Sequence, residues 1–273
     1  MEIIKNYTLN IEKLNANAEI FEEYAKAYDL EDIEISGKLY HTFRVAKMSK
    51  ELAKELGLNF ELAYNIGLLH DYARFEQWSR FHTFSDHKSI DHADFAVELL
   101  FEDNQIKRFN IKREDYLLIK LAIIFHNKLN VNLNYIKTAI KEDKTNKHSY
   151  EDIVTYCKLI RDADKLDIFN RIGNGDVTIY ETENGYTPRA LESIKSHNPV
   201  LYVDVHTKLD RLFVDICYLF DINFNQSLLK INLENYLNSL VINYGNSLNK
   251  TDIALLKDVM ADILKYFKTK LKG

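Results

Sequence analysis

Four short segments place side chains that can bind a metal ion inside or at the end of apolar, helix-like stretches. His41 lies in YHTFR, His70 and Asp71 close GLLHD, His126 lies in LAIIFHN, and Asp164 lies in RDADKLD. A buried imidazole or carboxylate loses its hydration and needs a partner, and one divalent cation can serve several such groups at once. These residue types in these positions therefore favour a bound divalent cation.

Each segment taken alone has a more ordinary interpretation. A single histidine such as His41 on an amphipathic helix is more often a hydrogen-bonded core residue than a ligand. The His70-Asp71 pair fits the C-terminus of a helix, and Asp164 can pair with basic neighbours at helical spacing. Only the four segments together, in this order and with these neighbours, indicate a metal site.

Basic residues near these segments are candidates for binding phosphate. Arg44 follows His41 by three residues, so the two side chains share a helix face, and a guanidinium group can contact two phosphate oxygens at once. Arg74 follows the His-Asp pair by three residues, whereas Lys165 and Arg80 are weaker candidates. For each of them the alternative is a surface salt bridge.

The spacing of the apolar residues predicts an all-α protein. Apolar residues recur mostly at intervals of three and four, and the chain has only two prolines and eight glycines. We predict nine helices, each with ends uncertain by about two to four residues. Their ranges are 18–28, 37–56, 60–70, 88–102, 113–129, 147–170, 205–220, 227–244 and 250–270.

Two stretches lack the helical period. Residues 72–87 are aromatic, polar and basic, which predicts a loop that passes over a site. Residues 173–199 contain most of the turn signals, and Asn184-Gly185 predicts a small β-hairpin near residues 176–187. We place a boundary near residue 200, between a metal-binding helical core (1–200) and a C-terminal helical extension packed on it (201–273).

The overall composition excludes several classes of protein. The formal net charge is −5 and the basic residues are scattered among acids, so nucleic acid is disfavoured as a partner. The N-terminus lacks the pattern of a secretory signal, and no apolar run approaches the length of a membrane span, so we expect a cytoplasmic protein with no membrane partner. We interpret Cys157 and Cys217 as buried, reduced thiols.

The sequence resembles the HD-domain superfamily of metal-dependent phosphohydrolases over about residues 36–170. The family pattern is a histidine on one helix, a His-Asp pair that ends a GLLHD-like helix, and a later aspartate in an A-D-x-L context. His41, His70-Asp71 and Asp164 match it residue by residue. The resemblance implies a helical bundle in which these four residues hold a metal ion.

A branch of this superfamily binds two metals and has two more histidines between the His-Asp pair and the last aspartate. His126 matches the later one, and His92, in SIDHADFAVELLF, resembles the earlier one. His82 and His87 compete with His92, which we prefer because a helix is a more rigid platform than an irregular stretch. The resemblance thus implies one or two divalent ions, Fe, Mn, Co, Ni or Zn, with Asp71 as the bridge; it favours Fe or Mn.

The resemblance implies an enzyme that cleaves a phosphate ester or phosphoanhydride, with hydroxide activated by the metal as the nucleophile. Arg44, Arg74 and Lys165 would assist beside Asp71, and the expected partner is a small phosphorylated substrate, a nucleotide in the leading case. Two alternatives stay open: a di-iron oxygenase acting on a small polyol or phosphonate, and a nucleotide sensor without turnover. A homo-oligomer is compatible with the sequence.

Overall fold

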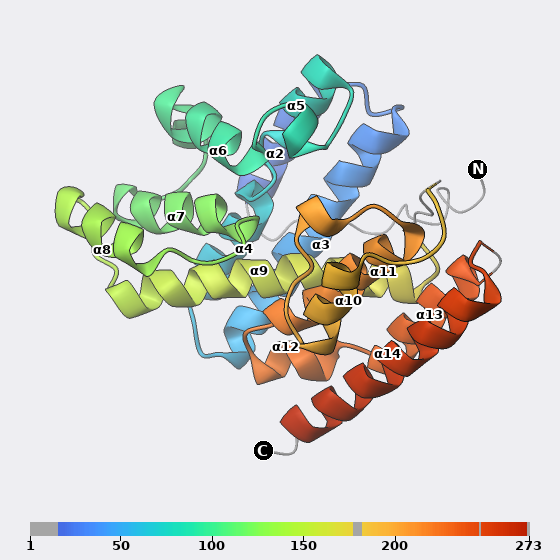
Figure 1. Ribbon diagram of the computed structural model, residues 1–273. Helices are drawn as coiled ribbons and strands as arrows, with labels where there is room; N and C mark the ends of the chain where they lie inside the picture. Colours follow the sequence, from blue (N-terminus) through green and yellow to red (C-terminus); the bar gives the residue numbers. More distant parts are fainter. Residues whose placement is uncertain (1–15, 177–181, 246, 272–273) are drawn as a thin grey trace. The chain divides into compact units, whose positions relative to one another are not determined.

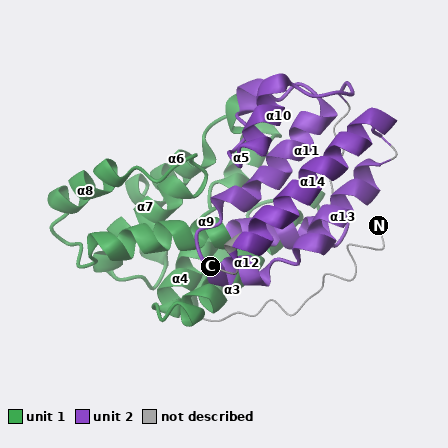
Figure 2. Cartoon of the chain, turned by 60° about the horizontal axis from the view of Figure 1, so that its bottom comes forward, with its two compact units in different colours: residues 1–163 green, residues 164–273 purple. Residues whose placement is uncertain are grey.

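The structure is a computed structural model that describes residues 16–176, 182–245 and 247–271. These residues form helices and no strand, so the prediction of an all-α fold is confirmed (Figure 1). The chain divides into two compact units, residues 1–163 and 164–273, and the division falls inside α9 (Tyr150–Gly173) (Figure 2). Each unit is described separately below.

The first unit contains seven further α-helices, together with short 3-10 segments and one turn of π-helix. The α-helices are α2 (Ala16–Ala25), α3 (Ile33–Glu55), α4 (Phe60–Leu69), α5 (Arg74–Phe81), α6 (His92–Val97), α7 (Tyr116–His126) and α8 (Leu133–Glu142). The π-helical turn is Glu98–Glu102, directly after α6. Capping side chains fix the starts of α3, α4 and α6: Asp32, Asn59 and Asp91 each accept hydrogen bonds from the following backbone N–H groups.

Close packing of α3 against α4 depends on Gly67. A Cβ atom at this position would lie 2.7 Å from the Cα of Ala46 and 2.8 Å from the Oγ of Ser49, nearer than such atoms can approach. Any larger residue would therefore push α4 away from α3. Because α3 carries His41 and α4 ends at His70, this contact sets the distance between two of the predicted metal ligands.

The prediction of a loop over residues 72–87 is wrong for residues 74–81, which form α5. One face of α5 is anchored by Phe75, whose ring packs edge-on against Phe21 and Tyr24 of α2. The other buried residue, Gln77, is polar, so the apolar spacing that identifies a helix is interrupted. Helix α8, with Ile136 as its one buried residue, is likewise absent from the predicted set.

The second unit has its own apolar core, built by the remaining helices. These are the end of α9 together with α10 (Pro188–Lys195), α11 (Lys208–Cys217), α12 (Asn225–Lys230), α13 (Leu233–Tyr244) and α14 (Lys250–Lys270). The prediction of one helix over 227–244 is wrong, because the chain breaks at Ile231 and Asn232 and restarts with Asn232 as the cap of α13. Asp215 of α11 is a buried carboxylate of this unit.

Four further predictions meet the structure in different ways. The hairpin near 176–187 falls partly on residues 177–181, which lie outside the described residues; residues 182–187 form no strand, only a bridge between Glu183 and Thr207. The boundary near residue 200 lies inside the second unit and stays a prediction. Within the described part of the chain, no helix combines the length and apolarity that crossing a membrane requires. Cys157 and Cys217 are buried free thiols.

Candidate metal centre

Five of the six predicted metal ligands meet at one place in the first unit. They come from four helices: His41 from the middle of α3, His70 and Asp71 from the end of α4, His92 from the start of α6, and His126 from the end of α7. Each of these residues is at most 5% exposed. A cluster of four imidazoles around one carboxylate, away from water, requires a partner that satisfies all of them.

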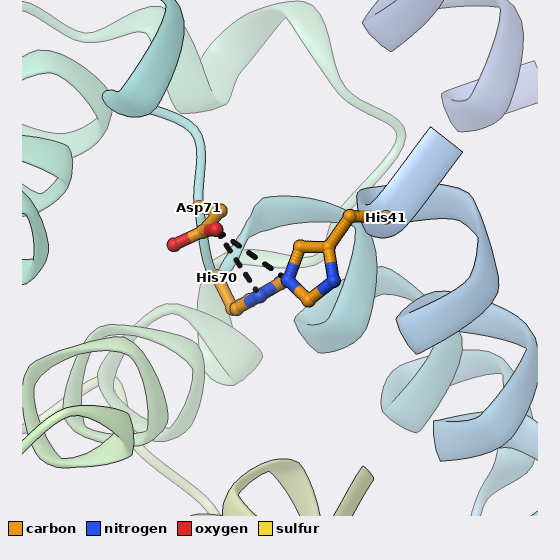
Figure 3. Close-up of side chains that lie close together, drawn as sticks. All are labelled: His41, His70 and Asp71. Carbon is orange, nitrogen blue, oxygen red and sulfur yellow. Dashed lines mark ion pairs between the residues drawn. The ribbon is translucent and has the colours of Figure 1, made fainter. Parts of the chain in front are cut away.

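One oxygen of Asp71 faces the histidines of α3 and α4. Its Oδ2 atom lies 3.6 Å from Nε2 of His41 and 3.7 Å from Nε2 of His70. Figure 3 shows both imidazole rings turned toward this carboxylate. These three residues form one group whose donor atoms all lie within 4.8 Å of one another.

The other oxygen of Asp71 faces the histidines of α6 and α7. Its Oδ1 atom lies 3.4 Å from Nε2 of His92 and 3.7 Å from Nε2 of His126, and these two nitrogens are 2.9 Å apart. This is a second group with metal-binding spacing, and it shares Asp71 with the first. The carboxylate therefore lies between two pairs of histidines, with one oxygen directed to each pair.

These distances fit divalent metal ions. Imidazole nitrogen and carboxylate oxygen bind a first-row ion at about 2.0–2.2 Å, so two donors on one ion lie within roughly 4.4 Å of each other. The four separations between Asp71 and the histidines, 3.4–3.7 Å, satisfy this condition. A set of imidazoles and carboxylate without thiolate suits Mn, Fe, Co, Ni or Zn.

Hydrogen bonds on the far side of three rings direct their Nε2 atoms into the cluster. Nδ1 of His70 lies 2.7 Å from the carbonyl oxygen of Gly67, and Nδ1 of His126 lies 2.6 Å from that of Ile123. Nδ1 of His92 lies 2.7 Å from Oδ2 of Asp86. When Nδ1–H donates to these oxygens, Nε2 keeps its lone pair for a metal ion.

Asp86 holds His92 from outside the cluster, and it was not identified from the sequence. Besides His92, its carboxylate accepts hydrogen bonds from Nη1 of Arg74 at 3.0 Å and from Nε2 of Gln77 at 3.1 Å. Gln77 is fully buried and donates also to Ser89 Oγ and the carbonyl of Ile90. This network joins α5, the following loop and α6, and it fixes the orientation of His92.

The ionisation of the cluster favours metal binding. Burial raises the pKa of Asp71, but the charges of Lys38, His70 and Arg74 outweigh burial and hold the pKa well below its usual range. Burial, with the nearby charge of Arg74, lowers the pKa of His92 to about 4. At neutral pH the aspartate is thus ionised and His92 is neutral, which are the forms that bind a cation.

Lys38 is the other residue missed in the sequence. Its Nζ lies 2.8 Å from Oδ2 of Asp71, and its ammonium group lies 5.2 Å from the centre of the Phe84 ring. Lys38 precedes His41 by three residues on α3, so both side chains share a face of the helix. That spacing was a usable signal, and it is the same signal that drew attention to Arg44.

Arg74 lies beside the cluster, and its guanidinium group is engaged by neighbouring residues of the chain; its predicted contact with phosphate stays a prediction. Nε lies 3.5 Å from Oδ1 of Asp71, and Nη1 donates to Gln77, to the carbonyl of Phe84 and to Asp86. These bonds favour a role in holding the cluster together over direct contact with a substrate. Arg44 is half-buried on α3, one turn after His41, and its role stays a prediction.

Asp164 and Lys165 belong to the second unit, and their roles also stay predictions. Both lie on α9; Asp164 is half-buried, and Nζ of Lys165 forms an ion pair of 2.6 Å with Asp221. The competitors of His92 are less suited as ligands: His82 ends α5 in a left-handed conformation, and both His82 and His87 are exposed. Neither belongs to a group with metal-binding spacing in the described residues.

A buried cluster of four histidines and an aspartate from several helices could hold divalent metal ions. Residues 39–168, somewhat less than half of the chain, match the family model for the HD domain, in agreement with the resemblance found in the sequence. The match spans His41, His70, Asp71, His92 and His126. Comparison with curated proteins and with solved structures gives no significant match.

Proposed function

We propose that this HD domain is a metal-dependent phosphohydrolase that cleaves a phosphate ester or phosphoanhydride of a small molecule, a nucleotide in the leading case. The observation that carries the proposal is the two-sided environment of Asp71. His41 and His70 would hold one divalent ion, His92 and His126 a second, and Asp71 would bridge them. We further propose Asp164 as the remaining ligand of the first ion, as the match to the family pattern implies.

In this proposal, some residues bind the metal ions and others keep those ligands in position. Bound divalent ions would lower the pKa of a coordinated water and polarise a phosphoryl oxygen. Asp86 keeps the ring of His92 in place, while the backbone carbonyls of Gly67 and Ile123 do so for His70 and His126. Burial of the four histidines and of Asp71 excludes bulk water, which strengthens each electrostatic contact among them.

The positions of Lys38 and Phe84 favour a substrate that carries both a phosphate group and an aromatic ring. Lys38 is the ammonium group nearest to Asp71, and we propose that it contacts phosphate oxygens of the substrate. The ring of Phe84 lies beside both Lys38 and Arg74, and 4.9 Å from the ring of Trp78. Aromatic surface next to positive charge suits a nucleobase attached to phosphate.

The test is metal analysis joined to a screen for phosphate release. Purified wild type, Asp71→Ala and the control Asp258→Ala, which alters an exposed residue of α14, are compared for bound Mn, Fe, Co, Ni and Zn. Each is then assayed on nucleoside phosphates and sugar phosphates with added Mn. We expect phosphate release by wild type and control, and a loss of about 100-fold or more in Asp71→Ala, because a bridging ligand is removed.

Two outcomes would contradict the proposal. Metal bound by wild type with no phosphate released from any substrate would indicate a binding module. Oxygen uptake by the iron-loaded protein with a polyol or phosphonate, in place of phosphate release, would indicate the oxygenase alternative.

A further inference from the structure

The first unit contains a groove that does not include the metal centre. Its volume is about 860 Å³, and its walls come from the first half of α7, from α8 and from the segment after α6. Helices α7 and α8 pack against each other (Figure 1). On α7 the groove ends at Leu121, whereas His126 ends the helix; Lys120 lies six residues, or about 9 Å along the axis, before His126.

Four basic side chains line this groove. Lys107, Arg113, Lys120 and Lys144 form no ion pair with a carboxylate in the parts of the chain that the structure describes. Three acidic residues also belong to the lining; one of them, Asp143, accepts hydrogen bonds from the backbone N–H and the hydroxyl of Thr145 and lies near enough to Arg113 for their charges to interact. The lining therefore contains one more basic than acidic side chain, on a chain whose net charge is −5.

Aromatic rings lie beside these cations. The guanidinium group of Arg113 lies 4.9 Å from the ring centre of Tyr116, and Nζ of Lys120 lies 6.0 Å from that of Phe101. These two rings meet edge to face at 5.9 Å. Tyr135, which lines the groove from α8, is 49% exposed. Exposed rings combined with Lys and Arg are the features that bind a base by stacking and its phosphates by charge.

The backbone at the edge of the groove is irregular. Phe101 and Glu102 end the π-helical turn, and Asn104 adopts a left-handed conformation with φ of 61°. Such irregularities occur often at functional sites, where they direct side chains that a regular helix would place elsewhere. The volume of the groove also lies within the range of about 300–1,000 Å³ that is usual for sites of small ligands.

We propose that this groove binds a nucleoside di- or triphosphate, as a ligand site separate from the metal centre. Tyr116, Phe101 and Tyr135 offer rings for the base, and Arg113, Lys120, Lys107 and Lys144 bind the phosphate oxygens. The carboxylates of Glu102 and Glu142 at the groove can accept hydrogen bonds from base N–H groups. This site goes beyond the proposed hydrolase activity and does not depend on it.

The experiment is equilibrium binding of N-methylanthraniloyl-ATP to the full chain in EDTA, followed by fluorescence. EDTA removes divalent ions, so neither turnover nor metal-bridged phosphate contributes. The variants are Arg113→Met/Lys120→Met in the groove, Asp71→Ala at the metal centre, and the control Lys137→Met, an exposed lysine of α8 outside the groove that lies over Tyr150. Ala139→Trp, which fills the groove without altering charge, is a second groove variant.

We expect saturable binding by wild type, Lys137→Met and Asp71→Ala, with affinities within about twofold of one another. The double variant should bind at least about tenfold more weakly, as should Ala139→Trp. Inorganic triphosphate and adenosine, used separately as competitors, should each displace the probe less effectively than ATP. The proposal is overturned if wild type does not bind, if both groove variants bind like wild type, or if Asp71→Ala alone abolishes binding.

Discussion

In the first unit, Asp71 faces four imidazole nitrogens, a lysine and an arginine; in the second unit, the equally buried Asp210 faces the main chain. Asp210 accepts hydrogen bonds from the backbone N–H groups of Thr187, His206 and Thr207 and from the hydroxyl of Thr187. Each unit thus buries a carboxylate, but only the second satisfies it locally with backbone donors.

The difference separates a carboxylate that stabilises the fold from one that is a candidate metal ligand. Backbone N–H groups tie Asp210 to the start of α11, where it completes a capping box with Thr207. The surroundings of Asp71 are side chains from five helices, α3 to α7, which gain little for the fold by meeting at one point. Convergence of four imidazoles on one carboxylate is the sign of a candidate site.

The largest expected effect is a loss of stability on substitution of Asp210. Asp210→Ala should lower the free energy of unfolding by roughly 3–5 kcal/mol, since it leaves several buried backbone donors without an acceptor. Asp71→Ala should fold and instead lose metal binding. Urea denaturation of both variants in EDTA checks this, and equal destabilisation by the two substitutions would remove the distinction.

Loss of the Asp86 carboxylate should lower the metal affinity of the site without abolishing metal binding. Asp86→Asn removes the charged acceptor of His92 Nδ1, and we expect Mn²⁺ affinity to fall by about 10–100-fold, the usual effect of losing an outer-layer partner. Isothermal titration with Mn²⁺ measures this. The matched control is Asp103→Asn, an exposed residue, which should bind as wild type does. An unchanged affinity in Asp86→Asn would show that His92 is positioned by other contacts.

Two glycines on the α3–α4 pair provide a comparison between close packing and open space. Gly67→Ala should destabilise the protein by about 1–3 kcal/mol, because a Cβ atom would collide with Ala46 and Ser49. Gly37→Ala meets nothing within 4 Å and should stabilise α3 by roughly 0.5–1 kcal/mol. Thermal unfolding of both variants is the measurement, and shifts of the same sign would contradict the account.

A pH-dependent effect concerns Asp215, a buried carboxylate of the second unit whose pKa burial raises to about 6, against an opposing effect of Arg211. The folded state therefore binds this proton more tightly than the unfolded state. This contribution to stability is complete below about pH 4 and is lost as the pH rises through about 6. Asp215→Asn should then be more stable than wild type by roughly 2–3 kcal/mol at pH 7 and equal to it near pH 4. Urea denaturation at both pH values tests this, and an equal difference at both would contradict the assignment.

Much of the metal centre was predictable because its residues stand in apolar helices with distinctive neighbours. His41, His70, Asp71, His92 and His126 all lie where helical spacing and family resemblance placed them, and the structure brings them together. Periodicity reports directly on burial, and a buried ligand is conspicuous against an apolar background.

The rest of the site depends on contacts between elements that spacing does not encode. Asp86 reaches His92 only because Gln77 and Arg74 of α5 hold the intervening loop, and α5 itself was hidden by its buried glutamine. The groove between α7 and α8 was missed because α8 buries a single residue, Ile136, and so gives a weak periodic signal. The spacing of apolar residues therefore carries least information about polar networks and about helices that bury few residues.

The most direct test of the central claim is an anomalous difference map from crystals of the full chain grown with Mn²⁺. The account predicts strong peaks next to the Asp71 carboxylate, one on the side of His41 and His70 and one on the side of His92 and His126. A map with no peak in contact with Asp71, from crystals in which Mn²⁺ is bound elsewhere, would contradict it.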